Sequence, residues 1–295
     1  MTANQQNKKA VVRPVAIIFN PNSTGDGEAN ARVLQKQLEA AGLKVELMPT
    51  KHAGHAVTLA KKFADTHKTG MVISSSGDGG YHEVVNGVMQ SKHPSVITGV
   101  LPSGNANDHY HSVHHGNTVQ RIANADYDEI DVLKVSTKAW THYAHSYVGL
   151  GMTPQIGEEL TKATLNPMRE AWLVVKNLFQ IKPVKIRQNG KVRRYNNVVF
   201  SNTPRMSKYL TLSTKASVTD GVFEITRVKA TNLWELLRHL FRATANQIDD
   251  APQAAKYSCT VLRATKIQLD GEVYDIPQGD EVVITCEHKK LRCIV

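Results

Sequence analysis

Three short segments of the chain combine glycine, asparagine and hydroxyl side chains in a way that suits phosphate binding. They are residues 20–25, residues 76–87 and residues 101–108. Backbone N–H groups and hydroxyls in such segments can hold a phosphate, helped by the positive end of a following helix dipole. Each segment alone could be an ordinary turn, and the first lacks the Gly-Lys-Ser/Thr ending of a Walker loop. Together the three segments favour a nucleotide site.

The second segment holds a carboxylate among its glycines. The glycines of Gly77–Gly80 let backbone approach a bulky ligand closely, so Asp78 is not needed to form the turn. Its carboxylate would suit a magnesium ion that accompanies nucleotide phosphates. Glu83 and Asn86 follow one turn apart on one helix face. Asp78 is therefore a candidate for steering a metal.

Two further Asp-Gly pairs occur late in the chain. Leu269-Asp270-Gly271-Glu272 places two carboxylates beside a glycine, which could supply a general base and an orienting group. A hairpin turn is the alternative, because Asp-Gly is frequent in hairpins. Thr219-Asp220-Gly221 has the same ambiguity, and its local sequence favours a turn.

The elements that would position these residues alternate in the first half of the chain. We expect strands at 15–19, 45–48, 71–74 and 96–101, and helices at 28–41, 53–66 and 82–90. Such alternation is typical of a parallel, doubly wound α/β sheet. Ligands on these sheets bind beyond the carboxyl ends of the strands, which is where the three loops fall.

After about Asp131 the pattern changes to short β-branched runs separated by turn residues, which is typical of an antiparallel sandwich. Helical insertions are expected at 168–180 and 232–246. The fold class predicted is an α/β N-terminal domain with a parallel sheet plus a C-terminal antiparallel β-sandwich domain. We place the domains at 1–133 and 134–295, with a last strand at about 284–295 that could return to the first domain.

The chain contains, in this order, the motifs Asn-Pro-x-Ser, Gly-Asp-Gly with Glu-Val-Val-Asn-Gly, Pro-x-Gly-x-x-Asn-Asp, Thr-Asp-Gly and Asp-Gly-Glu. This series resembles the diacylglycerol kinase catalytic family, which includes bacterial lipid kinases and sphingosine kinases. The resemblance covers Val15 to about Val295. It implies ATP-dependent phosphorylation of a lipid hydroxyl. It also implies an N-terminal domain like that of NAD kinases and 6-phosphofructokinases, with the nucleotide in the cleft beside a β-sandwich.

The resemblance also assigns roles to residues. Asp270 and Glu272 match the catalytic acidic pair, one of which accepts the proton, and Asp78 would lie at the ATP-magnesium site. Asp220, with the carbonyls of Ser217 and Val222, matches a structural Mg²⁺ site to which Asp131 is linked. The nucleotide-contacting positions are Asn20, Pro21, Asn22, Ser23, Thr24, Thr50, Gly77, Asp78, Gly79, Gly80, Tyr81, His82, Glu83 and Asn105.

The chain departs from the family pattern at several of these positions. Gly80 stands where Thr is usual, His82 where Asn is usual, and residues 104–108 lose a hydroxyl and a glycine. Thr219 also replaces a usual Asp. Diacylglycerol or a similar lipid is the first substrate class, and His82 suggests a sphingoid-base kinase as the alternative. A catalytically silent lipid- or nucleotide-binding protein is a further alternative.

Charge and composition limit the cellular location and the partners that we expect for this chain. The 295 residues carry 36 Lys+Arg and 26 Asp+Glu, a formal net charge of +10, and three cysteines without metal spacing. We find no export signal and no apolar run near the roughly 18 residues of a spanning helix. We expect a cytoplasmic protein that contacts its lipid at a membrane surface, without nucleic acid, because no aromatic-basic motif accompanies the charge. A homodimer stays open.

Three other features carry alternatives. Residues 182–194 form a basic strand pair, which is either a solvated face or a surface for anionic headgroups. The apolar stripe 233–241 either covers the core or lies in a membrane interface. His109, His111, His114 and His115 follow the third loop, where a solvated loop is favoured over a metal site.

Overall fold

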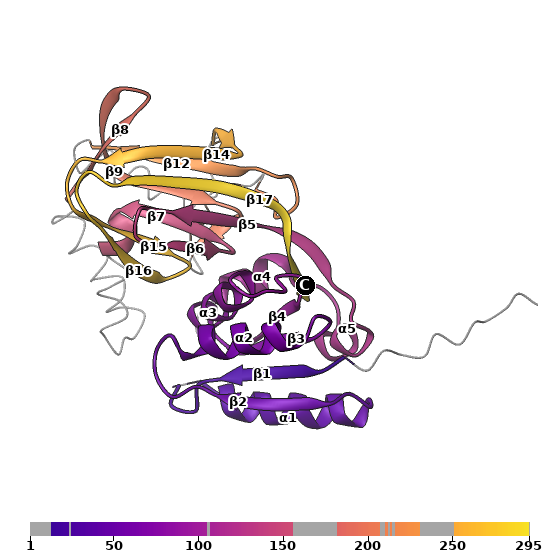
Figure 1. Ribbon diagram of the computed structural model, residues 1–295. Coiled ribbons are helices and arrows are strands. Elements are labelled where there is room, and N and C mark those ends of the chain that lie inside the picture. Colours follow the sequence, from indigo (N-terminus) through magenta and orange to yellow (C-terminus); the bar gives the residue numbers. More distant parts are fainter. Residues whose placement is uncertain are drawn as a thin grey trace, which may run out of the picture.

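The structure is a computed structural model that describes residues 13–23, 25–104, 107–155, 182–206, 210–211, 213, 216–230 and 251–294 (Figure 1). At positions 205, 210 and 211 it describes the backbone alone. The nucleotide candidates Thr24 and Asn105 lie outside the described residues, as do the expected helices at 168–180 and 232–246 and the stripe at 233–241.

The N-terminal part alternates strands and helices, as the sequence predicts. Its elements are β1 (Val15–Phe19), α1 (Gly27–Ala40), β2 (Val45–Pro49), α2 (His55–Thr66), β3 (Met71–Ser76), α3 (Asp78–Met89), β4 (Ile97–Pro102), α4 (Asp108–Val113) and α5 (Thr118–Asn124). The strands lie in the order β2–β1–β3–β4 and pair in parallel. The carboxyl ends of β1, β3 and β4 therefore meet at one edge, and the predicted parallel α/β sheet is confirmed.

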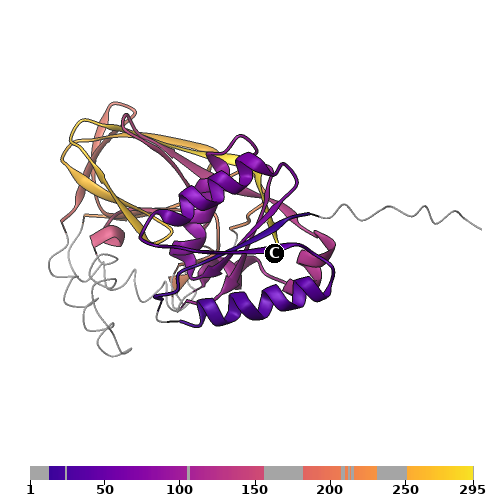
Figure 2. The ribbon, with the colours of Figure 1, turned by 60° about the horizontal axis from the view of Figure 1, so that its bottom comes forward.

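Helices cover both faces of this sheet (Figure 2). On one face, Leu34 of α1 and Ile122 of α5 share a core with Ile17 of β1. On the other face, Phe63 of α2 shares a core with Ile18. Neighbouring strand residues point to opposite faces, so a strand buried on both sides must be apolar throughout. This explains why β1 reads as an uninterrupted apolar run.

Helix α3 begins at Asp78, four residues earlier than the expected start at His82. Gly77 precedes it in an extended conformation. The glycines at 79 and 80 have low helix propensity and contribute nothing to apolar periodicity, so the sequence pattern missed this first turn. The consequence is that Asp78 lies on a helix rather than in a loop.

The C-terminal part is built from antiparallel strands, and the predicted fold class is confirmed here as well. Its strands are β5 (Asp128–Ser136), β6 (Thr141–Ala144), β7 (Tyr147–Gly151), β8 (Val184–Gln188), β9 (Lys191–Ser201), β10 (Arg205–Met206), β11 (Leu210–Thr211), β12 (Phe223–Lys229), β13 (Gln253–Ala254), β14 (Lys256–Val261), β15 (Thr265–Leu269), β16 (Glu272–Ile276) and β17 (Glu281–Ile294). Strands β10 and β11 pair with each other in a separate sheet. Other strands of this part enclose one core, in which the Phe200 ring contacts Phe223 and Tyr257.

Strand β17 connects the two parts. It runs antiparallel beside β5 and β14, is irregular between Glu287 and Leu291, and then pairs in parallel with β4, where Cys293 lies opposite Thr98. The end of β17 therefore extends the N-terminal sheet and lies between β4 and β5 (Figure 1). Among the described residues, no helix is both long and apolar enough to span a bilayer.

Candidate active site

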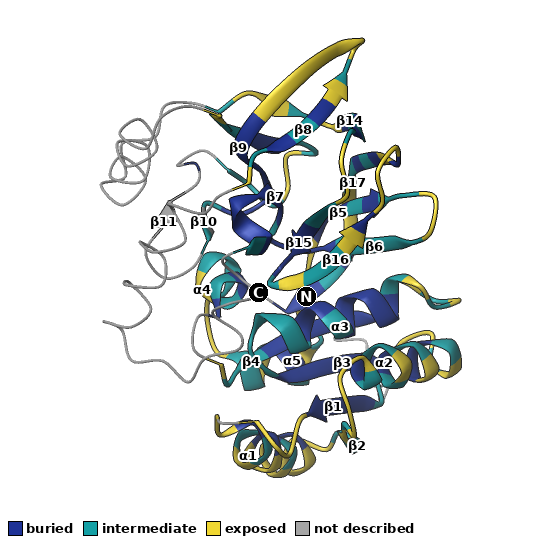
Figure 3. Cartoon of the chain, turned by 90° about the vertical axis from the view of Figure 1, so that its left-hand side faces the viewer, coloured by how far each residue is buried: buried dark blue, intermediate teal, exposed yellow. Residues whose placement is uncertain are grey.

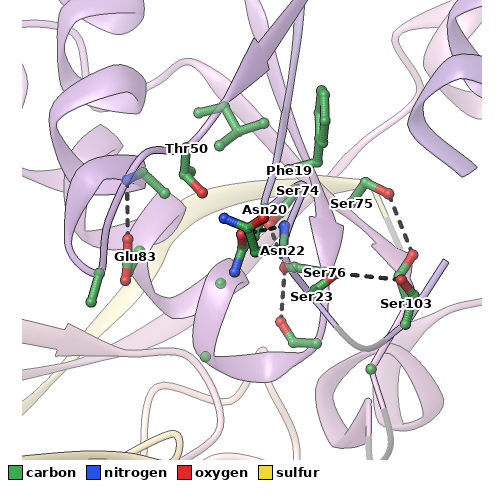
Figure 4. Close-up of a pocket in the computed structure, with 18 of the residues that line it drawn as sticks. Phe19, Asn20, Asn22, Ser23, Thr50, Ser74, Ser75, Ser76, Glu83 and Ser103 are labelled. Atoms are coloured by element: carbon green, nitrogen blue, oxygen red, sulfur yellow. Dashed lines mark hydrogen bonds between the residues drawn. The ribbon is translucent and has the colours of Figure 1, made fainter. Parts of the chain in front are cut away.

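A cavity of about 450 Å³ opens at the carboxyl edge of the parallel sheet (Figure 4). Its walls come from the ends of β1 and β3, the loops after β1, β2 and β4, the first turns of α3, and Glu272 at the start of β16. All three phosphate-type loops reach it. The predicted candidates that line it are Asn20, Asn22, Ser23, Thr50, Gly77, Gly79, Gly80, Glu83 and Glu272.

Hydroxyl groups form one wall of the cavity. Ser74 Oγ lies 2.6 Å from Ser76 Oγ, and Ser75 Oγ lies 3.3 Å from Ser103 Oγ and donates to the Gly27 carbonyl. Ser76 begins the second predicted segment, but Ser74 and Ser75 were not predicted as site residues, because the expected strand ended at Ser74. Three consecutive serines at the carboxyl end of a buried strand could have indicated this wall of hydroxyl groups from the sequence. Lys51, also missed, is the one Lys or Arg that lines the cavity among the described residues.

Two of the loops contact each other through their glycines. A Cβ added at Gly104 would come within 2.5 Å of the Gly77 Cα, and a Cβ at Gly77 within 3.2 Å of the Gly104 Cα. Larger residues would therefore push the loops after β3 and β4 apart. The glycines hold the two phosphate-type loops together at the floor of the cavity.

Carboxylates of α3 cap the helices on either side of it. Asp78 accepts hydrogen bonds from the backbone N–H groups of Asp108 (3.0 Å) and His109 (3.1 Å), at the start of α4. Glu83 accepts from Gly54 (2.9 Å) and Ala56 (3.0 Å), at the start of α2. Neither helix has a side-chain cap of its own. These negative charges therefore satisfy free N–H groups and the positive ends of the helix dipoles.

The Asp270-Gly271 pair forms the hairpin turn between β15 and β16, with φ of 50° at Asp270 and 104° at Gly271. Asp270-Gly271 is therefore a hairpin turn, as one interpretation of the sequence predicted, and the turn also positions a candidate site residue. The turn directs the Asp270 carboxylate into the protein, where Oδ1 accepts from the backbone N–H groups of Ser146 (2.9 Å) and Tyr147 (3.0 Å). Its Oδ2 accepts from the N–H of His145 (2.8 Å) and contacts His82.

These contacts set the charge of Asp270. Burial alone would raise the pKa of this carboxyl, but the charges of His145 and His82 and the bonds from backbone N–H groups outweigh burial and lower the pKa below its usual range. Burial also lowers the pKa of His145, against the attraction of Asp270. Asp270 is therefore a fully bonded carboxylate away from the cavity lining.

His82 was expected to contact the nucleotide, but its side chain is 2% exposed and does not line the cavity. Its Nδ1 lies 3.0 Å from Asp270 Oδ2, and its Nε2 lies 3.0 Å from the Tyr274 hydroxyl. Tyr81 is also buried, with its hydroxyl 2.9 Å from Thr98 Oγ1. Pro21 and Asp78 are likewise absent from the lining. In a helix only part of the circumference can face a cavity, so α3 presents Gly79, Gly80 and Glu83 and buries Tyr81 and His82.

Glu272 is the carboxylate of the acidic pair that reaches the cavity. It lies two residues beyond Asp270, after the turn, and is exposed. Its Oε1 would stand only 2.9 Å from a Cβ added at Gly79. The absence of a side chain at position 79 therefore allows Glu272 to approach the start of α3.

His109 is not part of a solvated loop, contrary to the sequence-based expectation. It lies in α4, is 1% exposed, and packs with its ring centroid 5.0 Å from Tyr81 and 4.5 Å from His145. Burial, with a smaller effect of His145, lowers the pKa of His109 well below its usual value. His109 and His145 are thus buried histidines in the contact between α3, α4 and the β6–β7 turn.

The Thr219-Asp220-Gly221 segment lies against Asp131, outside the cavity lining. Buried Asp131 accepts from the N–H groups of Gly221 (2.7 Å) and Lys289 (2.7 Å), and its Oδ1 lies 2.8 Å from His288 Nδ1. The Asp220 carboxylate is exposed and accepts from the Val222 N–H at 3.1 Å. Asp131 therefore anchors this segment to the place where β17 passes between the two parts.

Residues 14–135 match the family model of the diacylglycerol kinase catalytic domain. A diacylglycerol kinase of Bacillus subtilis (strain 168) is 26% identical over 90% of this chain and 92% of its own length. One from Staphylococcus aureus (strain JH9) is 27% identical over 87% of this chain and 85% of its own length.

The fold matches a solved structure as well. One similar structure is a crystal structure of a diacylglycerol kinase from Bacillus anthracis str. Sterne. The match covers 97% of this chain and 98% of that chain, with a TM-score of 0.72 and 19% sequence identity. Residues 14–135, which hold three of the motifs around the cavity, are therefore similar to the diacylglycerol kinase catalytic domain, and the names of the matched relatives support a lipid kinase.

Proposed function

We propose that this chain transfers the γ-phosphoryl group of ATP to the hydroxyl of a diacylglycerol or a similar lipid. The observation that carries the proposal is the meeting of two parts at one cavity. The N-terminal part contributes loops and hydroxyls suited to phosphate, and the C-terminal part contributes the carboxylate of Glu272. Diacylglycerol as the acceptor follows the names of the curated relatives.

The phosphates of the nucleotide would lie against the loop at 20–25 and the start of α3, where backbone N–H groups and serine hydroxyls are available. Lys51 would place a positive charge beside them. Phosphoryl transfer needs little covalent chemistry from the protein, so positioning and charge stabilisation are the main requirements. A cavity walled by hydroxyls and backbone supports that role.

Glu272 is the proton acceptor in this proposal. A general base must come within hydrogen-bond reach of the lipid hydroxyl, and Glu272 lines the cavity. Both oxygens of Asp270 are bonded inside the protein, and its lowered pKa makes it a weak base. Asp270 therefore acts as a positioning residue that holds the turn preceding Glu272.

Magnesium fits the oxygen donors present. Asp220 with the carbonyls of Ser217 and Val222 would hold a structural ion. Asp78, the predicted metal-steering residue, does not line the cavity and its two oxygens accept backbone N–H groups of α4, so it would act on an ion bound with the nucleotide only through its charge. Among the described residues no group of three His, Cys, Asp or Glu side chains could hold a metal, so such an ion would rely on one carboxylate, carbonyls and water. That set suits Mg²⁺, which keeps several waters. Bound magnesium would neutralise charge on the phosphates.

The experiment is turnover of labelled ATP with a panel of lipids in mixed micelles, including diacylglycerols and a sphingoid base. Glu272→Gln should lower kcat on the order of 10²–10⁴-fold, the usual contribution of a general base. Asp275→Asn is the matched control, because Asp275 is an exposed carboxylate on the same strand that does not line the cavity. Nucleotide binding without lipid phosphorylation would overturn the proposal and support a silent relative.

A further inference from the structure

The β8–β9 hairpin turns at Asn189-Gly190, with φ of 48° and 74° at these residues. Positive φ at both turn positions is the geometry that Asn-Gly favours, and it gives a tight hairpin. Residues 191–194 of β9 are all exposed. A strand on a covered sheet buries alternate residues, so four consecutive exposed residues mean that neither face of this end is covered (Figure 3).

The hairpin carries positive charge only. Six of the thirteen residues 182–194 are basic and none is acidic: Lys182, Lys185, Arg187, Lys191, Arg193 and Arg194. Within the part of the chain that the structure describes, none of the six forms an ion pair with a carboxylate. Unpaired cations at this density create a local positive field much stronger than the chain's average charge would give.

An apolar side chain stands in the middle of this charge. Val192 is 51% exposed and lies between Lys191 and Arg193. Among the described residues the only other large apolar side chain with comparable exposure is Val33, on α1 at the opposite part of the molecule. An exposed valine flanked by cations is suited to a surface that is both negatively charged and apolar beneath.

A hollow of about 550 Å³ lies at the base of the hairpin. Arg193, Arg194 and Lys229 line it together with Tyr195, Asn196, Pro183 and Ala230. Guanidinium groups recognise phosphate oxygens in a bidentate manner. The hollow therefore offers space and donors for a phosphate headgroup.

The hairpin also lies at a suitable end of the molecule. In Figure 1, β8 is at the left-hand end, as is β16, and strand β1 runs towards the same end. The carboxyl edge of the parallel sheet, where the cavity opens, faces that way. A planar surface approached by the hairpin would therefore be on the side of the candidate active site.

We propose that the β8–β9 hairpin docks the protein on an anionic lipid bilayer, with Lys191, Arg193 and Arg194 on headgroup phosphates and Val192 in the interface. The inference rests on the proposed function only for the reason to approach a bilayer, since lipid substrates lie there. Docking itself needs no nucleotide and no transfer step. Basic residues near an anionic surface each strengthen binding about fivefold, and salt screens this attraction.

Co-sedimentation with vesicles tests the proposal without ATP. The full chain should bind vesicles of phosphatidylglycerol and phosphatidylcholine far better than vesicles of phosphatidylcholine alone, and binding should fall as salt rises. Lys191→Gln/Arg193→Gln/Arg194→Gln should weaken binding to the anionic vesicles on the order of 100-fold. Val192→Ser should weaken it severalfold at fixed charge.

A matched variant removes the same charge elsewhere. Lys36→Gln/Lys44→Gln/Lys68→Gln removes three exposed cations from the N-terminal part, and Val33→Ser removes the other exposed valine. Equal losses of vesicle binding in the hairpin variants and in these control variants would overturn docking by the hairpin and leave only an effect of net charge. Turnover of a short-chain diacylglycerol in neutral detergent should be unchanged in the hairpin variant. Loss of turnover there with binding retained would refute docking as the hairpin's role.

Discussion

His82 Nδ1 lies 3.0 Å from Asp270 Oδ2, and this contact joins helix α3 of the N-terminal part to the β15–β16 turn of the C-terminal part. Both side chains are almost fully buried. The backbone N–H groups at 145–147 complete the shell around the carboxylate. The pair therefore fixes the distance between the phosphate-type loops and the hairpin that carries Glu272.

Asp270→Asn should lower stability as well as activity. Asparagine adopts positive φ readily, so the turn is retained, but its amide group would face backbone N–H donors without a charge to hold them. We expect a loss of about 3 kcal/mol or more in the free energy of unfolding, measured by urea denaturation. Glu272→Gln should leave the free energy unchanged. Equal stability of the two variants would contradict the positioning role of Asp270.

Gly80→Ala should destabilise the protein through Ser76. A Cβ at position 80 would overlap the Ser76 side chain, which lies beside it in the cavity wall. Overpacking of this kind costs about 1–3 kcal/mol. The double variant Ser76→Gly/Gly80→Ala should regain most of that loss, because it removes the overlapping hydroxyl. Additive effects of the two substitutions in denaturation would disprove the contact.

Stability should fall as the pH is lowered from 7 to 5. Burial lowers the folded-state pKa of His109 well below that of the unfolded chain, about 6.5, so below that pH the unfolded state binds the extra proton. The lowered pKa of Asp270 matters only below about pH 4, where its stabilisation is lost. The pH range from 7 to 5 therefore reports on the histidines.

His109→Gln should flatten this dependence by up to about 1.4 kcal/mol per pH unit. The measurement is the free energy of unfolding in urea at pH 7, 6 and 5. His111→Gln provides the control, since His111 is exposed on the same helix. An unchanged slope in His109→Gln would mean that this histidine accepts its proton in the folded protein.

Magnesium should stabilise the chain through Asp220. An ion that binds only the folded state adds about 2.7 kcal/mol at a hundredfold excess over its Kd. The wild type should therefore melt at a higher temperature in Mg²⁺ than in chelator, and Asp220→Asn should lose the difference. Asp275→Asn should keep it. A wild-type melting temperature that is indifferent to Mg²⁺ would remove the structural ion from the proposal.

Local patterns were sufficient for much of the fold. The apolar run at 15–19 and the helical spacing that follows it depend on neighbours a few residues apart, so the parallel sheet and its loops were predictable. The ordered motifs also located the cavity, because parallel strands bring their carboxyl ends to one edge. The start of α3 was missed because two glycines mask the periodicity of its first turn.

Side-chain direction was decided by the tertiary structure. Asp270 and Glu272 look equivalent in sequence, yet a turn with two positive φ values buries the first and leaves the second in the cavity wall. His82 and His109 read as a ligand and a loop residue, but the C-terminal strands cover both. No local pattern reports which face of a helix another part of the chain will cover.

By itself, the sequence determined the resemblance to a kinase family, the alternation of strands and helices and the residues that could bind phosphate, because these depend on residue type and short spacing. The tertiary structure alone decided which carboxylate faces the cavity and which one holds the two parts together. His82 and Asp270 are 188 residues apart, and their contact exists only because β15 and β16 fold back onto α3. Burial and charge at that contact are properties of the assembled fold, since they arise from groups brought together across the chain.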